Sequence, residues 1–246
     1  YFLGNVYWIY HSLYYYGSVP LIFSYIVVFA LAFYLSLYPV IFSLLYKNLL
    51  KSNLPTSLYA PFLWVSFEVL RTYLLTGFPW ALIGYSQYKF SLISQIADIT
   101  GIYGVSFLVL LFNCFIFDIW IFRKRKITYP LFPYYPIIIT TFLVIVIFSL
   151  SVLYGLKKLN EDDNGDSIKV AIIQGSIPQD EKWDFKKVEE IISIYKKLTL
   201  QSKEHNPHLI VWPETALPFI FEKNKHFTSD IINFVFQEKI YLLVGS

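Results

Sequence analysis

Residues 209–218 read Leu-Ile-Val-Trp-Pro-Glu-Thr-Ala-Leu-Pro, and this stretch decides how the second half of the chain folds. Residues 209–212 form a short apolar run with a β-branched centre, which is typical of a buried strand. Pro207 precedes the run and Pro213 follows it, and neither can extend a hydrogen-bonded ladder. Ligands of open α/β sheets bind beyond the carboxyl ends of the strands, so chemistry is expected at the carboxylate of Glu214. A surface glutamate that merely follows a strand is the alternative.

Strand and helix patterns alternate on both sides of this stretch. An apolar run at 168–173 predicts a strand, and apolar residues recur at helical spacing over 186–202, with Lys and Glu on the opposite face. Residues 228–239 predict a second helix with a Thr or Ser cap, and 240–244 a third strand. The order strand, helix, strand, helix, strand predicts an α/β layer. Because about 80 residues are fewer than a complete domain of this kind has, we expect an unfinished sheet edge.

The first part of the chain has the composition of a membrane protein. Of 246 residues, 56% are hydrophobic, 20% are aromatic and only 15% are charged, whereas soluble domains carry about 25% charged residues. A bilayer core needs ~20 apolar residues, and part of a first span is expected before residue 19. The sequence predicts further spans at about 21–46, 58–75, 102–122 and 137–154.

The basic residues predict the orientation of these spans. Positive charge collects on the cytoplasmic side of short loops, so Lys47, Lys51 and the Arg-Lys-Arg-Lys run at 123–126 are expected inside. Both signals put residues 76–101, and everything after Tyr154, outside the cytoplasm.

Two ionisable residues lie within the second predicted span. Glu68 and Arg71 stand three positions apart, so their side chains are expected to pair on one helix face. Ionisable groups in a span are functional candidates by default, but such a pair is also an adequate structural account.

Several other kinds of site are disfavoured. The net charge of +3 is small and the basic residues are not interleaved with stacking aromatics, so nucleic-acid binding has little support. Cys114 is the single cysteine, which excludes a disulfide framework or a cysteine metal site within the chain. It lies in an apolar segment and is interpreted as a buried hydrophobe. The histidines show no metal-ligand spacing, so no metal site is predicted.

Three motifs of the α/β part resemble the nitrilase-type domain of apolipoprotein N-acyltransferases. They are Trp-Pro-Glu-Thr-Ala-Leu-Pro at 212–218, Gln-Gly-Ser-Ile-Pro-Gln at 174–179 and Lys-Trp-Asp at 182–184. Thr-Gly-Phe-Pro-Trp at 76–80 and Gly-Tyr-Ser-Gln at 84–87 resemble the membrane part of the same family. The likeness covers nearly the whole chain, whereas soluble nitrilases lack the bundle.

The resemblance implies a multi-span transmembrane α-helical bundle joined to an α/β nitrilase-like domain of the αββα sandwich type, incomplete here. The division expected is a bundle over 1–158, a linker over 159–167 and the N-terminal part of the extracytoplasmic domain over 168–246. Because residue 1 is Tyr and the family motifs break off at residue 246, we expect the sequence to be truncated at both ends.

The same resemblance implies a phospholipid-to-apolipoprotein N-acyltransferase. An acyl chain would pass through a cysteine thioester to the α-amino group of a lipoprotein's N-terminal diacylglyceryl-cysteine. Glu214 falls on the first position of the superfamily's Glu-Lys-Cys triad, where it would act as a base. The Lys and Cys would lie beyond Ser246. Trp183 falls on a Trp that lines the substrate pocket, the alternative being an aromatic that packs at a helix entry.

The expected partners are a phospholipid donor, an apolipoprotein acceptor and membrane lipid, and no metal or organic cofactor is implied. The expected location is the bacterial cytoplasmic (inner) membrane, with the catalytic domain on the periplasmic side. One alternative is a membrane-tethered nitrilase-type amidase, in which water takes the acyl group. The other is a non-catalytic lipid-binding or transport bundle, which the Gly- and Pro-interrupted region 76–84 would suit.

Overall fold

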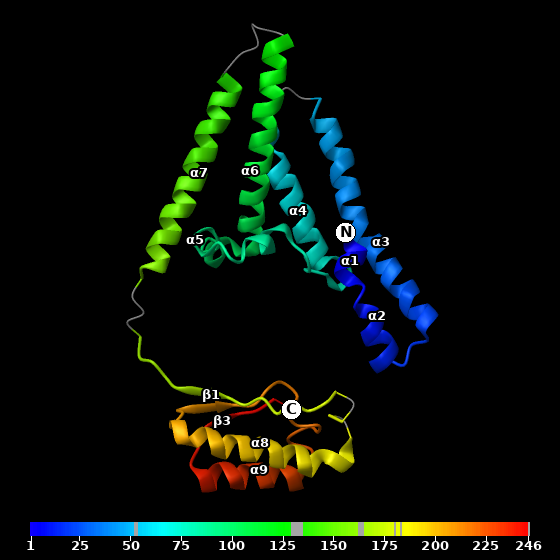
Figure 1. Ribbon diagram of the computed structural model, residues 1–246, viewed down its shortest axis with the longest axis vertical. Helices are drawn as coiled ribbons and strands as arrows, with labels where there is room; N and C mark the ends of the chain where they lie inside the picture. Colours follow the sequence, from blue (N-terminus) through cyan, green and yellow to red (C-terminus); the bar gives the residue numbers. More distant parts are fainter. Residues whose placement is uncertain (52–53, 129–134, 162–164, 180, 183, 246) are drawn as a thin grey trace. The chain divides into compact units, whose positions relative to one another are not determined.

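The computed structural model of the chain describes all residues except 52–53, 129–134, 162–164, 180, 183 and 246. The chain divides into two compact units, residues 1–162 and 163–246, and each unit has its own packing. The first unit is helical, and the second combines helices with a small parallel sheet (Figure 1).

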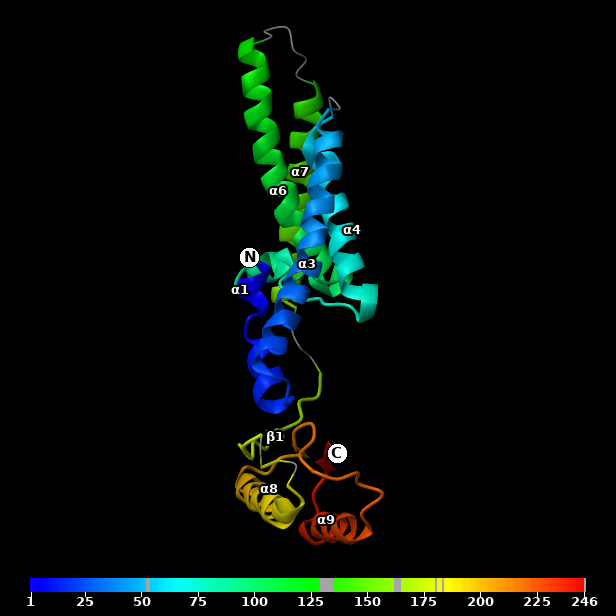
Figure 2. The same ribbon diagram turned by 90° about the vertical axis from the view of Figure 1, so that its right-hand side faces the viewer.

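The helices of the first unit differ greatly in length (Figure 2). The α-helices are α1 (Phe2–Val6), α2 (Ile9–His11), α3 (Leu21–Leu49), α4 (Ala60–Tyr73), α5 (Ser91–Ser94), α6 (Ala97–Thr128) and α7 (Tyr135–Leu159). Short turns of 3-10 or π type connect them: η1 (Ser12–Tyr16), η2 (Thr56–Leu58), η3 (Leu74–Thr76) and η4 (Ile83–Gln87).

Three of the described helices are long and apolar enough to cross a membrane. They are α3, the Ala97–Lys124 part of α6, and α7, with mean hydropathies of 2.2, 2.3 and 2.7. Helix α4, within the predicted span 58–75, has only 14 residues. At 1.5 Å per residue it covers about 21 Å, less than the ~30 Å hydrocarbon core. It ends where Leu75, Thr76 and Gly77 take positive φ values, because a right-handed helix cannot continue through that backbone.

A buried carboxylate joins α6 to the segment that begins α4. Asp118 on α6 accepts hydrogen bonds from the backbone N–H of Thr56 at 2.7 Å and of Ser57 at 2.9 Å. The Ser57 hydroxyl donates to the same carboxylate at 2.6 Å. These N–H groups open η2 and have no carbonyl partner within a helix, so Asp118 supplies from another helix the acceptor that a local cap would provide.

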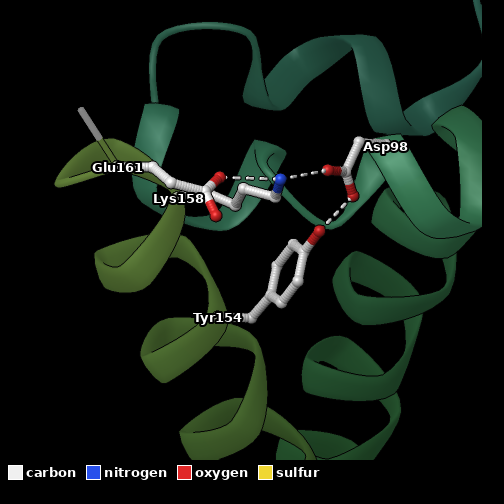
Figure 3. Close-up of polar contacts among 4 residues, drawn as sticks. All are labelled: Asp98, Tyr154, Lys158 and Glu161. Atoms are coloured by element: carbon white, nitrogen blue, oxygen red, sulfur yellow. Dashed lines mark hydrogen bonds and ion pairs between the residues drawn. The ribbon is translucent and has the colours of Figure 1, made fainter. Parts of the chain in front are cut away.

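A polar cluster joins the start of α6 to the end of α7 (Figure 3). The Tyr154 hydroxyl donates to Asp98 Oδ1 at 2.5 Å. The ammonium of Lys158 lies 3.6 Å from Asp98 Oδ2 and 2.9 Å from Glu161 Oε2. Asp98 lies in the first turn of α6 and Lys158 in the last turn of α7, positions where the helix dipoles favour those charges.

The second unit contains three parallel strands in the order β1-β2-β3. They are β1 (Val170–Ile172), β2 (Leu209–Val211) and β3 (Leu242–Leu243), and α8 (Val188–Ser202) and α9 (Lys225–Glu238) alternate with them. Two 3-10 turns, η5 (Phe185–Lys187) and η6 (Lys203–His205), flank α8. The predicted alternation of strands and helices is therefore confirmed. The predicted Thr or Ser cap of the last helix is wrong, because Asn224 caps α9 by accepting from the Phe227 N–H at 3.3 Å.

Both helices pack on one face of this sheet, as Figures 1 and 2 show. Ile191 and Tyr195 of α8 and Ile231 of α9 form a buried core with Ile210 of β2 and the neighbouring Trp212. The opposite face is open in the described part of the chain. Val170, Ile172 and Leu243 are 42%, 79% and 58% exposed. A sheet in a stable domain buries its apolar side against another layer, so this face is a surface to be covered.

Candidate functional site

The end of β2 is fixed in place by Trp212. This side chain is only 2% exposed, and its backbone N–H donates to the Leu243 carbonyl of β3 at 2.9 Å. Its indole N–H donates to the Thr199 hydroxyl of α8 at 2.9 Å, and its ring stacks on Tyr195 at 5.1 Å between centroids. Trp212, which lies two residues before Glu214, is therefore held in place by contacts with Leu243, Thr199 and Tyr195.

Glu214 stands in a tight turn over residues 213–216. The Ala216 N–H donates to the Pro213 carbonyl at 3.1 Å, which closes the turn. Thr215 has a φ of +53°, a left-handed conformation that is unusual for a β-branched residue. Strained backbone of this kind concentrates at functional sites. Within this turn Ala216 is buried and Glu214 is exposed.

Strand β3 ends directly against this turn. A Cβ added to Gly245 would lie 2.8 Å from Glu214 Cα, 2.9 Å from the Pro213 carbonyl oxygen and 3.0 Å from the Thr215 nitrogen. The Gly245 carbonyl also accepts from the Leu217 N–H at 3.4 Å. Only glycine permits this approach, so Gly245 sets the height of the Glu214 backbone above the sheet.

The Glu214 side chain is exposed to solvent, and within the described residues its carboxylate has no hydrogen-bond or ion-pair partner. The described residues do not enclose this carboxylate. Both packing helices lie on one face of the sheet (Figures 1 and 2), and Ile172 and Leu243 on its other face are exposed.

The end of β1 reaches the same edge of the sheet. The loop after β1 contains Gly175, whose added Cβ would lie 2.8 Å from Cζ and 3.0 Å from the hydroxyl oxygen of Tyr195. Burial raises the pKa of this phenol, so it stays a neutral hydroxyl. Ser176 follows with a φ of +50°. Trp183, the predicted substrate-binding residue, lies outside the described residues.

A depression adjoins the 213–216 turn through Thr215. Thr215, Leu217 and Phe219 line a depression of about 770 Å³, together with Phe185 and Lys223. Leu217 and Phe219 are buried, whereas Phe185 of η5 is largely exposed. The depression therefore combines buried apolar residues with an exposed lysine, and Thr215 of the 213–216 turn is one of its lining residues.

The expected ion pair between Glu68 and Arg71 is not present in the described bundle. Glu68 Oε1 instead accepts from the Trp64 indole N–H and from the Ile83 backbone N–H, each at 2.9 Å. Arg71 Nη2 donates to the Ala81 carbonyl at 3.4 Å. Both side chains are buried, and both fasten the 81–83 loop to α4. Each side chain has a backbone group of this loop nearer to it than the oppositely charged side chain. This is a structural role.

Other chemistry-bearing residues do not join the Glu214 site. Cys114 is buried in α6 with a free thiol. Among the described residues, no group of three or more His, Cys, Asp or Glu side chains could hold a metal ion. The carboxyl edge of the sheet is thus the candidate site in this part of the chain.

Sequence reasoning found Glu214 but missed the residues that hold its turn. Thr199 is fully buried and lies four positions after Tyr195, on the same face of α8. A polar residue at that spacing in an apolar stripe is a signal that could have found it. Gly245 carries no comparable local signal, because its role comes from the neighbouring strand.

Comparison with known proteins assigns the family. Residues 1–115 match the family model described as the apolipoprotein N-acyltransferase N-terminal domain. The chain is 37% identical over 248 residues to the apolipoprotein N-acyltransferase of Geobacter metallireducens, an alignment that covers 100% of the chain and 46% of that protein. The enzymes of that name from Wigglesworthia glossinidia brevipalpis and Haemophilus ducreyi are 33% and 32% identical over 99% and 100% of the chain.

These alignments cover 46% of each of the three relatives, so the chain spans about half the length of the curated relatives it matches. They run through both units and include the Glu214 turn as well as the helical part. From the family model and these relatives together, the chain belongs to the apolipoprotein N-acyltransferase family.

Proposed function

We propose that the complete protein transfers an acyl chain from a phospholipid to an apolipoprotein, with Glu214 as the general base. The observation that carries the proposal is the strained turn that presents Glu214 at the carboxyl edge of a parallel sheet. Relatives that match almost the entire chain bear the name of this activity. A membrane protein suits the task, because both substrates are anchored in lipid and must meet the site at headgroup level.

We infer that the division of the chain follows this task. Residues 1–158 form the membrane bundle, 159–167 a linker and 168–246 the first part of a nitrilase-like αββα sandwich. The open apolar face at Ile172 and Leu243 supports the sandwich, because a second sheet packed there would bury it. The same cover would enclose the carboxyl edge and dry the environment of Glu214.

The chemistry proposed has two steps. In the first, Glu214 accepts the proton of a cysteine thiol outside this chain, and the thiolate attacks the ester carbonyl carbon of a phospholipid. A C–S bond forms, the C–O ester bond breaks, and the lysophospholipid oxygen leaves with the proton that Glu214 returns. In the second, the α-amino nitrogen of the apolipoprotein attacks the thioester carbon. A C–N bond forms, the C–S bond breaks, and the amine proton passes through Glu214 to the thiolate.

The remaining proposals concern residues and orientation. A lysine outside this chain would stabilise the oxyanion of each step, and Trp183 would line the pocket. The basic run at 123–126 puts the Glu214 unit on the periplasmic side of the inner membrane. A reporter active only outside the cytoplasm should work when fused after Gly165 and fail when fused at Lys126, and the reverse pattern would refute the orientation.

The experiment that tests the base role is Glu214→Gln in the complete gene product. The amide keeps the shape of the side chain but cannot take a proton, so thioester formation from a labelled phospholipid should slow by about 10²- to 10⁴-fold. Glu222→Gln is the matched control, because Glu222 is an exposed glutamate of the same unit outside the turn. An unchanged thioester rate in Glu214→Gln would leave Glu214 as scaffold. Release of free fatty acid without an acceptor would indicate an amidase instead.

A further inference from the structure

Two charged side chains of the helical unit each keep one buried polar atom without a partner. Glu68 and Arg71 on α4 are only 3% and 4% exposed. Glu68 Oε1 accepts the hydrogen bonds from Trp64 and Ile83. Within the described part of the chain, however, Glu68 Oε2 and Arg71 Nε have no hydrogen-bond partner. Burying such an atom unpaired costs the full free energy of its desolvation, so both atoms need a ligand.

Glu68 and Arg71 line the same small cavity. Its volume is about 20 Å³, measured as the space open to the centre of a water molecule. Space of about 10–15 Å³ on this measure is enough to hold one water. The other lining residues are Phe2, Tyr38, Pro39, Trp64 and Phe67. The cavity therefore has room for one water molecule and lies beside both residues with unpartnered atoms.

The two unpartnered atoms need opposite kinds of hydrogen bond. A carboxylate oxygen of Glu68 can only accept, and the Nε–H of Arg71 can only donate. A cation in the cavity would be repelled by the guanidinium, and an anion would be repelled by the carboxylate. Water is uncharged and can donate to one atom while it accepts from the other. The chemistry of the pair thus selects water over an ion.

Tyr38 offers a third partner. Its hydroxyl is hydrogen-bonded to the hydroxyl of Tyr34, and Tyr34 donates to the Leu74 carbonyl at 3.3 Å. Because each hydroxyl has only one proton, Tyr38 is the donor to Tyr34. The Tyr38 oxygen therefore keeps a lone pair that can accept a further hydrogen bond. Buried waters typically make about three hydrogen bonds, which is the number that this cavity provides.

We propose that this cavity is a binding site for one ordered water molecule. The water donates to Glu68 Oε2 and to the Tyr38 hydroxyl oxygen, and it accepts from Arg71 Nε–H. It satisfies both unpartnered atoms and links the two opposite charges without direct contact. The inference concerns the helical unit alone and does not depend on the acyl-transfer chemistry.

The water completes a network that holds both ends of the segment 74–83. Tyr34 binds the Leu74 carbonyl at one end, and Glu68 and Arg71 bind backbone groups of residues 83 and 81 at the other. Backbone with positive φ is strained in residues other than glycine and persists only where its surroundings restrain it. Three residues of the segment have such values: Leu75 at 52°, Thr76 at 72° and Ala81 at 57°. The network supplies restraint on both sides of them.

The test is a crystal structure of the complete protein at a resolution that shows ordered water. We expect a solvent peak at hydrogen-bonding distance, about 2.7–3.2 Å, from Glu68 Oε2, Arg71 Nε and the Tyr38 hydroxyl oxygen. The proposal would be overturned by a cavity without this peak in a map that shows other buried waters. A direct contact between the Glu68 carboxylate and the Arg71 guanidinium would overturn it as well.

Two variants test whether the side chains act through one shared water. Tyr38→Phe keeps the ring but removes one acceptor, so the solvent peak should weaken and the melting temperature should fall by a few degrees. The losses from Tyr38→Phe and Glu68→Gln should not add, because both changes act on the same water. In the control pair, Tyr38→Phe with Asp118→Asn, the losses should add, since Asp118 binds the separate η2 segment. Strictly additive losses in the first pair would overturn the network.

Discussion

Gly245→Ala should displace the Glu214 turn without removing any polar group. The new Cβ would lie 2.8 Å from Glu214 Cα and within 3.0 Å of two further backbone atoms of the turn. Ordinary van der Waals contact begins at 3.4 Å, so the turn and the end of β3 must separate by 3.4 − 2.8 = 0.6 Å. Backbone atoms cannot rotate away as a side chain would, so the whole turn has to move.

The magnitude follows from this displacement. Overpacking a well-filled site costs about 1–3 kcal/mol of unfolding free energy. The long hydrogen bond from the Leu217 N–H to the Gly245 carbonyl, 3.4 Å, would weaken further. For the reaction, a 1 Å misplacement of a catalytic group costs on the order of 10²-fold, so a shift of about half that size should slow thioester formation by about ten-fold or more.

The assay compares thermal unfolding and thioester formation in the complete protein. At saturating phospholipid the maximal rate of thioester formation should fall, because the displaced turn carries Glu214. Gly4→Ala is the matched control, since a Cβ there meets nothing within 4 Å and alanine favours a helix. A Gly245→Ala protein with wild-type rate and melting temperature would refute the reasoning.

Three further predictions concern packing and charge. Asp118→Ala should leave the buried backbone N–H groups of Thr56 and Ser57 without an acceptor and lower the unfolding free energy by about 1–3 kcal/mol. Thermal unfolding measures this loss, and an unchanged melting temperature would count against the interhelical cap. Trp212→Phe and Thr199→Val should each lower the unfolding free energy of the second unit. The double variant should lose less than the sum of the two single losses, because it leaves neither hydrogen-bond partner unpaired. Strictly additive losses would exclude a coupling through this hydrogen bond. The hydrogen bond from Lys158 holds the pKa of Glu161 below its ordinary value of 4.5. Because the pKa of Glu161 is lower in the folded protein, its contact with Lys158 stabilises the fold at pH values above the ordinary pKa. This stabilisation is lost as the pH falls through the lower, folded-state pKa. Glu161→Gln should therefore flatten the stability profile below about pH 5, and a profile identical to the wild type would contradict it.

The parts of the site that the sequence predicts are those with local causes. The strand at 209–212 is short, apolar and bounded by prolines, and these features are independent of the rest of the fold. The position of Glu214 at the end of that strand follows directly. The alternation of helices and strands from 168 onward is confirmed for the same reason, because each amphipathic pattern is contained within its own segment.

The parts that could not be predicted depend on neighbours distant in sequence. The length of α4 is limited by the left-handed backbone at Leu75 and Thr76, and an apolar run gives no warning of that conformation. Glu68 and Arg71 stand at a spacing that suits an ion pair, yet each is taken by the backbone of the 81–83 loop. Spacing along one helix does not reveal a competing partner supplied by a loop.

The exposure of Glu214 and the open face of the sheet have a common physical cause. A parallel sheet is normally covered on both faces, and here α8 and α9 cover only one. A layer that buried Ile172 and Leu243 would exclude water from the same edge at which the 213–216 turn projects its carboxylate. Desolvation raises the pKa of a carboxyl group and makes it a better proton acceptor near neutral pH. One covering layer would therefore have two effects. It would bury the apolar face of the sheet, and it would give Glu214 the dry environment that its proposed role as a base needs.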